Sequence, residues 1–453
     1  MNLPVSFEES MRNYLGESWK DFEQTYEESG FFGIRYNPLK INKEQFLACS
    51  PVSLEEIPWC KTGFYYDGER EQPAKHPYYH AGLYYIQEPS AMLPAALLPI
   101  EPGDKVLDLC AAPGGKSTQI AGRLKGEGLL VSNDISISRA RALVKNLEMT
   151  GVSNAVVTSE KPAKLAGVFS GFFDKILVDA PCSGEGMFRR NPQMIRDYMD
   201  RGPSYYAELQ KEILSEAVKM LKPGGYLLYS TCTFSPEEDE RTAEWILRQD
   251  PSLKICDGFA FEGRGRGMPE WIASNDDSLR MAYRMWPHRI SGEGHFAVLF
   301  RKDEEEKMNT FSRREKGKKP SDEAEHFLKM VHLNDDHGVY EEIAGKLYLI
   351  PNLMPETKGI RIVRSGLYLG DQKKKRFEPS QALAMAIKPE QYEPSISLPI
   401  TDQRVIKYLK CETIPLDGPD GTILFCVDHF PLGWGKLKNG SLKNKYAASW
   451  RWV

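Results

Sequence analysis

The sequence predicts an α/β protein with a doubly wound, mostly parallel sheet at its centre, a small domain before it and a binding unit after it. Between residues 105 and 302, short apolar runs alternate with longer amphipathic segments, which is the pattern of strands and helices in such a sheet. A turn of small residues follows the first apolar run, at the place where α/β sheets bind nucleotides. These two observations indicate the fold class.

Six apolar runs are predicted to be strands of this sheet: residues 105–109, 129–132, 155–158, 175–178, 226–229 and 296–300. Three amphipathic segments are predicted to be its helices: residues 138–149, 205–221 and 236–248. The last begins at Pro236, because proline suits a first helical turn.

The chain of 453 residues is too long for one ordinary core, and at about 150 residues per domain it predicts two to four domains. We predict an N-terminal α+β domain, a catalytic domain, a polar linker, an intermediate domain and a C-terminal RNA-binding domain. Their residues are 1–75 (helical over 7–28), 76–303, 304–322, 323–395 and 396–453.

Bulk composition narrows the class of protein. A hydrophobic fraction of 41% with 27% charged residues is ordinary for a globular protein. No apolar run reaches the roughly 18 residues of a membrane span, and the N-terminus does not resemble a signal peptide. We therefore expect a cytoplasmic monomer without membrane contact. The net charge of −4 excludes a uniformly basic nucleic-acid binder, so any RNA surface must be local.

The segment D-L-C-A-A-P-G-G-K-S, residues 108–117, follows the first predicted strand and opens a helix. Small residues let the backbone approach a ligand, and free N–H groups face it at the helix start. A triphosphate-binding loop would need glycine where Leu109 stands, so an adenosine ligand is favoured. The candidate cofactor-binding residues are Cys110, Ala111, Ala112, Pro113, Gly114, Gly115 and Lys116.

Asp134 ends the second strand about 20 residues past the glycines, a position that suits the hydroxyls of a ribose. The alternative is a helix N-cap or a loop acid. Arg139 either pairs with a nearby acid or lies on the helix surface.

Two cysteines come directly after neighbouring strands, in D-A-P-C-S-G-E-G (residues 179–186) and S-T-C-T (residues 230–233). Cys182 and Cys232 should therefore meet at the ligand-facing edge of the sheet, beside Asp179. Cys49, Cys60, Cys256, Cys411 and Cys426 are instead expected to be small buried hydrophobes. Because no C-x-x-C pair occurs, neither a metal site nor a disulfide framework is indicated.

Two thiols and an acid suit methylation of a pyrimidine at carbon 5. Addition of a thiolate at carbon 6 turns the ring into an enamine whose carbon 5 can attack a methyl donor. Asp179 could hold a proton at N3, which requires a raised pKa in a dry pocket. A second thiol could help to release the product.

These motifs, together with S-T-C-T-F-S-P-E-E-D, resemble those of the Sun-type RNA 5-methylcytosine methyltransferases over residues 80–302. The resemblance implies a Rossmann-like class I core that uses S-adenosylmethionine. It implies Cys232 as the nucleophile, Cys182 as the residue that assists elimination, and Asp179 as the ligand of the base. Residues 110–116, Asp134 and Asp179 would line the cofactor pocket.

Two points depart from the family pattern. The acid that often contacts adenine after the third strand is not obvious, so either Glu160 or a backbone group takes that role. In addition, Pro181-Cys182 mimics the nucleophile of DNA cytosine methyltransferases, although the strand-end S-T-C-T motif favours Cys232.

Basic segments are candidates for an RNA surface: residues 188–192, 263–267, 373–376 and 430–452. The segment F-P-L-G-W-G-K resembles the PUA-like domain of the RsmF type of bacterial ribosomal RNA methyltransferase, which implies a cytosine in small-subunit (16S) ribosomal RNA. Trp450 and Trp452 could instead form the core of a small β domain. Two alternatives stay open, an exocyclic-nitrogen methyltransferase and a non-catalytic ribosome-assembly factor that binds RNA.

Overall fold

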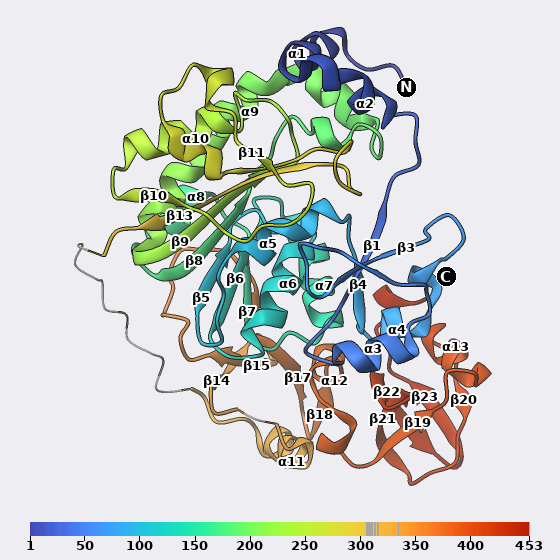
Figure 1. The fold of residues 1–453 in the computed structure, drawn as a ribbon. Helices are drawn as coiled ribbons and strands as arrows, with labels where there is room; N and C mark the ends of the chain where they lie inside the picture. Colours follow the sequence, from blue (N-terminus) through green and yellow to red (C-terminus); the bar gives the residue numbers. More distant parts are fainter. Residues whose placement is uncertain (305–310, 312–313, 315–316, 334, 453) are drawn as a thin grey trace.

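A ten-stranded sheet forms the centre of the molecule (Figure 1). The computed structural model describes residues 1–304, 311, 314, 317–333 and 335–452. The order of the sheet is β11-β12-β13-β9-β8-β5-β6-β7-β16, and β10 pairs with β13. The strands are β5 (Lys105–Asp108), β6 (Leu129–Asn133), β7 (Ala155–Thr158), β8 (Phe173–Asp179), β9 (Leu221–Thr231), β10 (Leu253–Cys256), β11 (Gly265–Arg266), β12 (Tyr283–Met285), β13 (His295–Lys302) and β16 (Ile362–Ser365).

The five central strands are parallel, and β13 is antiparallel to β9. Each of the six predicted strands is present, and the order reverses between β5 and β8, so the doubly wound fold is confirmed. At such a reversal the loops that follow the two strands diverge to opposite faces and leave a crevice for a ligand.

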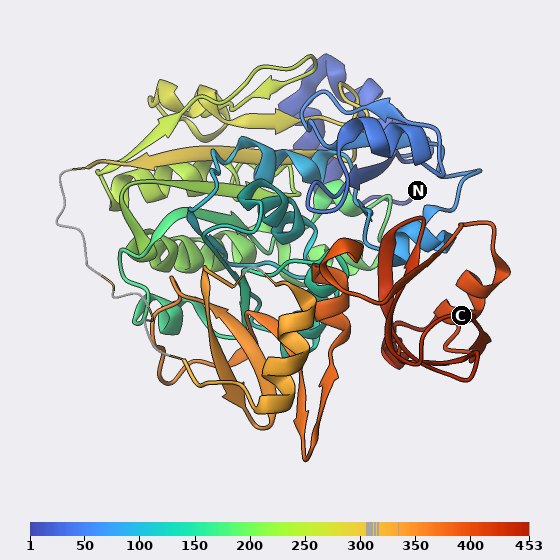
Figure 2. The same cartoon turned by 90° about the horizontal axis from the view of Figure 1, so that it is seen from below.

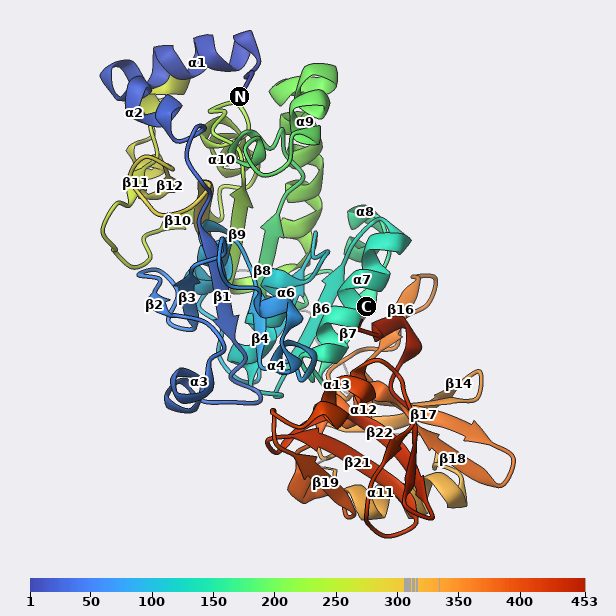
Figure 3. The ribbon, with the colours of Figure 1, turned by 90° about the vertical axis from the view of Figure 1, so that its right-hand side faces the viewer.

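Helices cover both faces of the sheet, because alternate residues along each strand point to opposite sides. Val106 and Leu130 pack with α5, α6 and α7, whereas Leu107 and Val131 pack with α8, α9 and α10. Figure 3 shows α6 and α9 on either side of the sheet. The bounds are α5 (Leu93–Leu97), α6 (Gly115–Leu124), α7 (Ile137–Met149), α8 (Pro162–Ala166), α9 (Gln193–Met220) and α10 (Glu240–Gln249).

Two helices differ from the prediction. Helix α9 begins at Gln193, well before residue 205, and bends at Gly202, where φ is 71°. The prediction that a helix begins at Pro236 is wrong, because α10 starts at Glu240. The intervening turn directs the carboxylates of Glu238 and Asp239 into the protein, where they accept hydrogen bonds from other segments.

The N-terminal part contains a four-stranded antiparallel sheet in the order β2-β3-β1-β4. The expected helix over residues 7–28 is divided at Gly16, whose φ is 55°. Strand β4 lies beyond residue 75 and pairs with β1, so this sheet extends into the segment that precedes the cofactor turn. The elements are α1 (Val5–Leu15), α2 (Trp19–Gln24), β1 (Phe32–Tyr36), α3 (Lys43–Cys49), β2 (Glu55–Glu56), β3 (Gly63–Tyr66), α4 (Pro77–His80) and β4 (Tyr84–Ile86).

The C-terminal part forms a four-stranded sheet, β14-β15-β17-β18, and a five-stranded sheet, β19-β21-β22-β23-β20. Figure 2 shows the two units side by side on one side of the central domain. Their elements are α11 (Asp322–Val331), β14 (Gly338–Ile343), β15 (Lys346–Pro351), β17 (Leu367–Lys373), β18 (Arg376–Pro379), α12 (Gln381–Ala386), β19 (Ser395–Leu398), α13 (Gln403–Leu409), β20 (Ile414–Pro415), β21 (Gly421–Val427), β22 (Phe430–Lys438) and β23 (Ser441–Asn444).

Contacts between distant segments join these units. Trp452 stacks on His80 of the N-terminal part at a ring separation of 5.2 Å, and Tyr78 donates a 2.7 Å hydrogen bond to Asp428. The C-terminal sheet and the N-terminal sheet therefore share an apolar core.

Much of the predicted linker, residues 305–310, 312–313 and 315–316, lies outside the described residues. Of its described residues, Phe311 packs on Phe172 of the central domain, and Arg314 pairs with Glu341 at 2.6 Å. Among the described helices, none has the length and hydropathy of a membrane span.

Candidate active site

A cavity of about 220 Å³ lies at the carboxyl ends of β5 and β8, where the strand order reverses. Most of the predicted cofactor turn is among its lining residues. These are Tyr85, Ile86, Gln87, Ala91, Asp108, Cys110, Ala111, Ala112, Pro113, Gly115, Lys116 and Asp179. The cavity therefore forms where the sequence motif predicts a ligand.

The backbone of the turn approaches its surroundings as closely as glycine allows. A Cβ atom at Gly115 would lie 3.0 Å from Gln87 Nε2, and Gly114 has a φ of 115°. Gly115 begins α6, so N–H groups of the first helical turn lie at the cavity.

The lining of the cavity is acidic. Asp108 is fully buried and accepts a 2.6 Å hydrogen bond from Ser117 on one oxygen, while its Oδ1 has no hydrogen-bond partner among the described residues. Burial raises the pKa of Asp108 to about 7. An unpartnered oxygen and the nearby Asp179 fit a ligand that carries donor groups and positive charge, as an adenosyl sulfonium does.

The N-terminal part completes the cavity, which the sequence motifs did not indicate. Tyr85 lies in β4 and Gln87 directly follows it, and Arg35 of β1 holds this edge in place. The Arg35 guanidinium donates to Gln87, and its Nη2 donates to Thr118 of α6 at 2.6 Å. The signal that could have revealed these residues is the polar Gln-Glu-Pro-Ser run directly after an apolar strand.

The two predicted catalytic cysteines meet. Cys182 follows β8 and Cys232 follows β9, and the parallel register pairs Asp179 with Ser230. The sulfur atoms of Cys182 and Cys232 are 3.3 Å apart. Cys182 is buried, and both its hydrogen bond with Cys232 and its burial raise the pKa of its thiol, whereas Cys232 is partly exposed. The more accessible sulfur is therefore the predicted nucleophile.

Asp179 lines the cavity and is the last residue of β8, the strand that precedes Cys182. Its Oδ2 accepts a 2.7 Å hydrogen bond from Lys116 Nζ, and its Oδ1 accepts one from Ser230 and lies 3.3 Å from His295 Nε2. Burial alone would raise the pKa of Asp179, but the charge of Lys116 and the contact with His295 outweigh it and hold the pKa well below its usual value. The expectation of a raised pKa at Asp179 is wrong.

Comparisons with known proteins cover this site and the flanking units. Family models match residues 3–89 as the N-terminal domain of 16S rRNA methyltransferase RsmF, and residues 95–301 as 16S rRNA methyltransferase RsmB/F. Two more match residues 326–387 as the RsmF first C-terminal domain, and residues 395–452 as the RsmF PUA domain. The ribosomal RNA small subunit methyltransferase F of Shewanella woodyi is 32% identical over 434 residues, which cover 91% of this chain and 88% of the relative.

The chain belongs to the RsmB/F family and is of the RsmF type. The relative of the same name from Vibrio vulnificus is 28% identical over 98% of this chain and 96% of its own length. Among solved structures, a methyltransferase homolog protein from Pyrococcus horikoshii matches with a TM-score of 0.57 at 28% identity. That match covers 66% of this chain and all of the other, so this RsmF-type chain shares a Rossmann-like methyltransferase core with it.

Four predicted cofactor residues lie outside the lining of the cavity: Gly114 within the turn, and Asp134, Arg139 and Glu160 beyond it. Asp134 is buried and accepts a hydrogen bond from Ser136 N at 2.9 Å, and Arg139 Nη2 bridges Asp134 and the Ala112 carbonyl. Arg139 therefore joins the end of β6 to the cofactor turn of this RsmF-type protein. Glu160 instead binds the Lys164 ammonium and the Arg361 backbone N–H, each at 2.7 Å, next to β16.

The five remaining cysteines are only partly as expected. Cys60 and Cys426 are buried, whereas Cys49, Cys256 and Cys411 are partly exposed. Within the part of the chain that the structure describes, no cluster of three histidine, cysteine or acidic side chains could hold a metal ion.

Arg189 and Arg190, in the predicted RNA segment 188–192, both pair with Glu293, at 2.8 Å and 2.6 Å, and the RNA role of this segment stays a prediction. They also donate to carbonyl groups of the N-terminal part, Thr25 and Phe31, and so fasten it to the catalytic domain. Sequence alone could not reveal this, because the partners lie more than 100 residues away.

The other basic segments differ in exposure. Arg264 lies 3.7 Å from the centre of the Tyr283 ring and pairs with Asp257, whereas Arg266 is exposed. Residues 373–376 form the exposed tip of the β17–β18 hairpin.

In the RsmF PUA domain, the tryptophans and lysines separate. Trp434 and Trp450 are buried, which favours the core-packing interpretation for Trp450, and Trp452 stacks on His80. Lys436 and Lys438 are exposed on one face of β22, and Lys443 is opposite Lys436 on β23. With the exposed Lys445, we call these four residues the lysine ridge.

Proposed function

We propose that this RsmF-type protein transfers a methyl group from S-adenosylmethionine to carbon 5 of a cytosine in 16S ribosomal RNA, with Cys232 as the nucleophile. The observation that carries the proposal is the pair of sulfur atoms 3.3 Å apart, on the strand ends next to Asp179 and the cavity. Neither of the two alternatives, an exocyclic-nitrogen methyltransferase or a non-catalytic assembly factor, requires a thiol pair at this place.

Each catalytic group has a separate task. The Cys232 thiolate forms a bond to carbon 6 of the ring, and the displaced electron pair makes carbon 5 nucleophilic. Bound S-adenosylmethionine supplies the methyl group. After carbon 5 gains the methyl group, the Cys182 sulfur, as a thiolate, takes the proton of carbon 5, the freed electron pair re-forms the double bond between carbons 5 and 6, and the Cys232 thiolate is expelled. Cys182 assists this elimination.

The low pKa of Asp179 changes its task from the one that the sequence predicted. As a carboxylate it accepts a hydrogen bond, so it can bind and orient the amino group of cytosine instead of supplying a proton. Lys116 places positive charge at the same point, where electron density builds up as the thiolate adds to the ring.

For the cofactor, the residues that fit are Asp108, Gly115, Lys116 and the side chains of Tyr85 and Gln87 that close the cavity. We keep Asp134 as a candidate for the ribose and Glu160 as a weaker one for adenine. The RNA surface that we propose is the lysine ridge together with the hairpin tip at residues 373–376, and we expect the protein to act as a monomer.

The test uses the full chain with labelled S-adenosylmethionine and either 16S ribosomal RNA or assembled small subunits, followed by mapping of 5-methylcytosine. Cys182→Ala should trap a covalent RNA adduct, and Cys232→Ala should form none and methylate nothing. An adduct that persists in Cys232→Ala but disappears in Cys182→Ala would reverse the two assignments. Methylation of an amino nitrogen would refute the reaction.

A further inference from the structure

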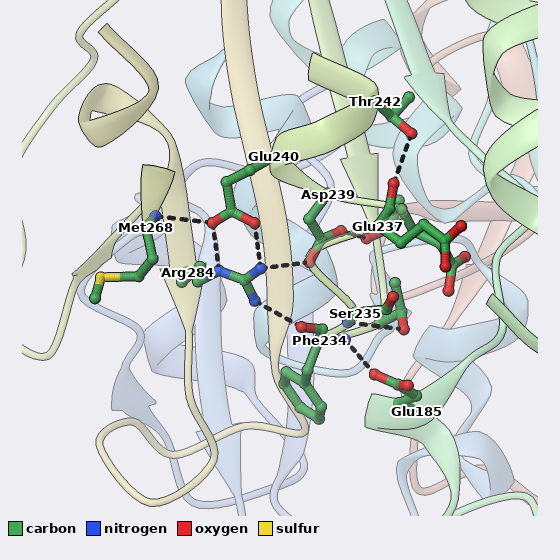
Figure 4. Close-up of polar contacts among 12 residues, drawn as sticks. Glu185, Phe234, Ser235, Glu237, Asp239, Glu240, Thr242, Met268 and Arg284 are labelled. Carbon is green, nitrogen blue, oxygen red and sulfur yellow. Dashed lines mark hydrogen bonds and ion pairs between the residues drawn. The ribbon is translucent and has the colours of Figure 1, made fainter. Parts of the chain in front are cut away.

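Four carboxylates and a single guanidinium lie buried behind the two cysteines. Glu185, Glu238, Asp239 and Glu240 are each at most 3% exposed, and Arg284 is 2% exposed. Figure 4 shows Arg284 between Glu240 and Asp239, with Glu185 on the far side of the Phe234 backbone. Glu240 and Asp239 pair with Arg284, which leaves Glu185 and Glu238 without a salt-bridge partner among the described residues.

This group holds the backbone on both sides of Cys232. Thr231 Oγ1 donates to Asp239 at 2.6 Å, and Phe234 N donates to Glu185 at 2.8 Å. The Arg284 guanidinium donates to the Phe234 carbonyl at 3.0 Å. The Cys232 carbonyl itself accepts a 2.9 Å hydrogen bond from Gly186 N, next to Glu185.

Glu238 extends these contacts to the other cysteine. Its Oε2 accepts hydrogen bonds from Ser183 N at 2.9 Å and from Gln210 Nε2 at 2.8 Å, and its Oε1 binds the Ser183 hydroxyl. The same hydroxyl lies 2.8 Å from Thr233 Oγ1. Because Ser183 follows Cys182 and Thr233 follows Cys232, the path Glu238–Ser183–Thr233 links the two cysteine loops.

Burial of these acids is costly. An unpaired buried carboxylate is strongly disfavoured unless it is protonated or hydrogen-bonded, and apolar residues of similar size would often be at least as stable. Burial raises the pKa of Glu185 to about 7 and that of Glu238 to about 8. These buried acids reduce stability, yet they form hydrogen bonds to the loops that carry the reacting sulfur atoms. We take this as a sign that they position those loops.

We propose that Glu238 is a positioning residue for the methyl transfer, which acts through Ser183 and Thr233 to hold the Cys182 sulfur beside the Cys232 sulfur. The inference rests on the proposed function, because it assigns a purpose to the closeness of the two thiols. Glu238 itself touches neither RNA nor cofactor in this role.

The experiment measures the closeness of the thiols without RNA or cofactor. Diamide, which takes up the two thiol hydrogens, oxidises the folded full-length protein, and mass spectrometry follows the rate at which Cys182 and Cys232 become linked. The variants are Glu238→Ala, which removes the acceptors, and Glu238→Gln, whose amide oxygen can still accept from Ser183 N while its nitrogen donates to the hydroxyl. The matched control is Glu237→Gln, because the neighbouring Glu237 carboxylate contacts Ser204 at the surface.

We expect Glu238→Ala to slow formation of the linkage and to lower kcat about tenfold or more, with little change in KM for either substrate, because about 1 Å of misplacement has such effects. Glu238→Gln and Glu237→Gln should stay within about twofold of the unmodified protein, a loss of at most about 0.4 kcal/mol in the activation barrier. Linkage in Glu238→Ala as fast as in the unmodified protein would overturn the inference.

If Glu238→Ala does not fold, Glu238→Asp replaces it, because it keeps the carboxyl group but shortens the reach by one methylene. The two proposals fail separately. Absence of 5-methylcytosine from the unmodified protein's product would refute the proposed function, whereas the linkage rates alone decide the inference about Glu238.

Discussion

Lys116 Nζ lies 2.7 Å from Asp179 Oδ2, and this ion pair joins the cofactor turn to the strand end beside the cysteines. Lys116 is the second residue of α6, and Asp179 is the last residue of β8. The cofactor turn and the acid at the end of β8 are therefore linked through one contact.

Lys116→Met should raise the pKa of Asp179, because burial raises this pKa and the largest charge that opposes burial is removed. Since the ionised acid is the active form in our proposal, the acidic limb of kcat/KM should move to higher pH, and kcat/KM at pH 7 should fall about 10–100-fold. Steady-state methylation between pH 5 and 9 measures both effects, with Lys116→Arg as the charge-conserving control. An unchanged acidic limb in Lys116→Met would show that Asp179 does not need to be ionised.

The buried acids predict a dependence of stability on pH. Glu185 and Glu238 have folded-state pKa values of about 7 and about 8, above the unfolded value near 4.3, so the folded state retains their protons longer. Their contribution is fully present below about pH 4.3 and is lost as pH rises through about 7 and 8. The free energy of unfolding should fall by several kcal/mol over that interval, because each unit of pKa shift corresponds to about 1.4 kcal/mol. Urea unfolding of the Glu185→Gln/Glu238→Gln double variant should show a flatter profile, whereas Glu237→Gln should keep the slope.

Arg284→Gln should destabilise the protein by about 3–5 kcal/mol, because it leaves Glu240 and Asp239 buried without a cation. The Phe234 carbonyl would also lose its donor. Arg280→Gln is a matched control, since Arg280 pairs with Glu270 at the exposed surface, where such pairs contribute about 0–1 kcal/mol. Thermal and urea unfolding measure the difference, and equal losses in both variants would contradict the central role of Arg284.

Replacing the lysine ridge by glutamate should weaken RNA binding and reduce its dependence on salt, because up to four phosphate contacts are lost. S-adenosylmethionine binding should not change, since the ridge is far along the chain from the cavity and none of its residues lines it. Filter binding at several salt concentrations measures the effect. Lys407→Glu/Lys410→Glu, on exposed positions of the same unit, is the control, and an equal loss there would mean that overall charge, not the ridge, governs binding.

The sequence predicted what depends on local pattern. Strands β5 to β9 followed from apolar runs that are buried on both faces, and the meeting of Cys182 with Cys232 followed from their positions after adjacent parallel strands. The cofactor turn was also located from local pattern, because the small residues that a close backbone approach requires are neighbours in the sequence.

Features that depend on distant contacts were missed. The pKa of Asp179 is lowered by Lys116 and His295, which are 63 and 116 residues away. The direction of this shift could not be predicted from the motif. The ion pairs of Arg189 and Arg190 with Glu293 were missed as well. Both features concern charges whose partners are brought together only by the fold.

Strand β16 has a consequence for synthesis of the chain. It pairs with the outer edge of β7, and Ser159 N and Arg361 O continue this contact at the end of the sheet. The catalytic sheet therefore remains incomplete until residue 365 has emerged from the translating ribosome. A nascent chain that stops near residue 303 would leave the outer edge of β7 unpaired, and an unpaired edge is a place where strands of other chains can add.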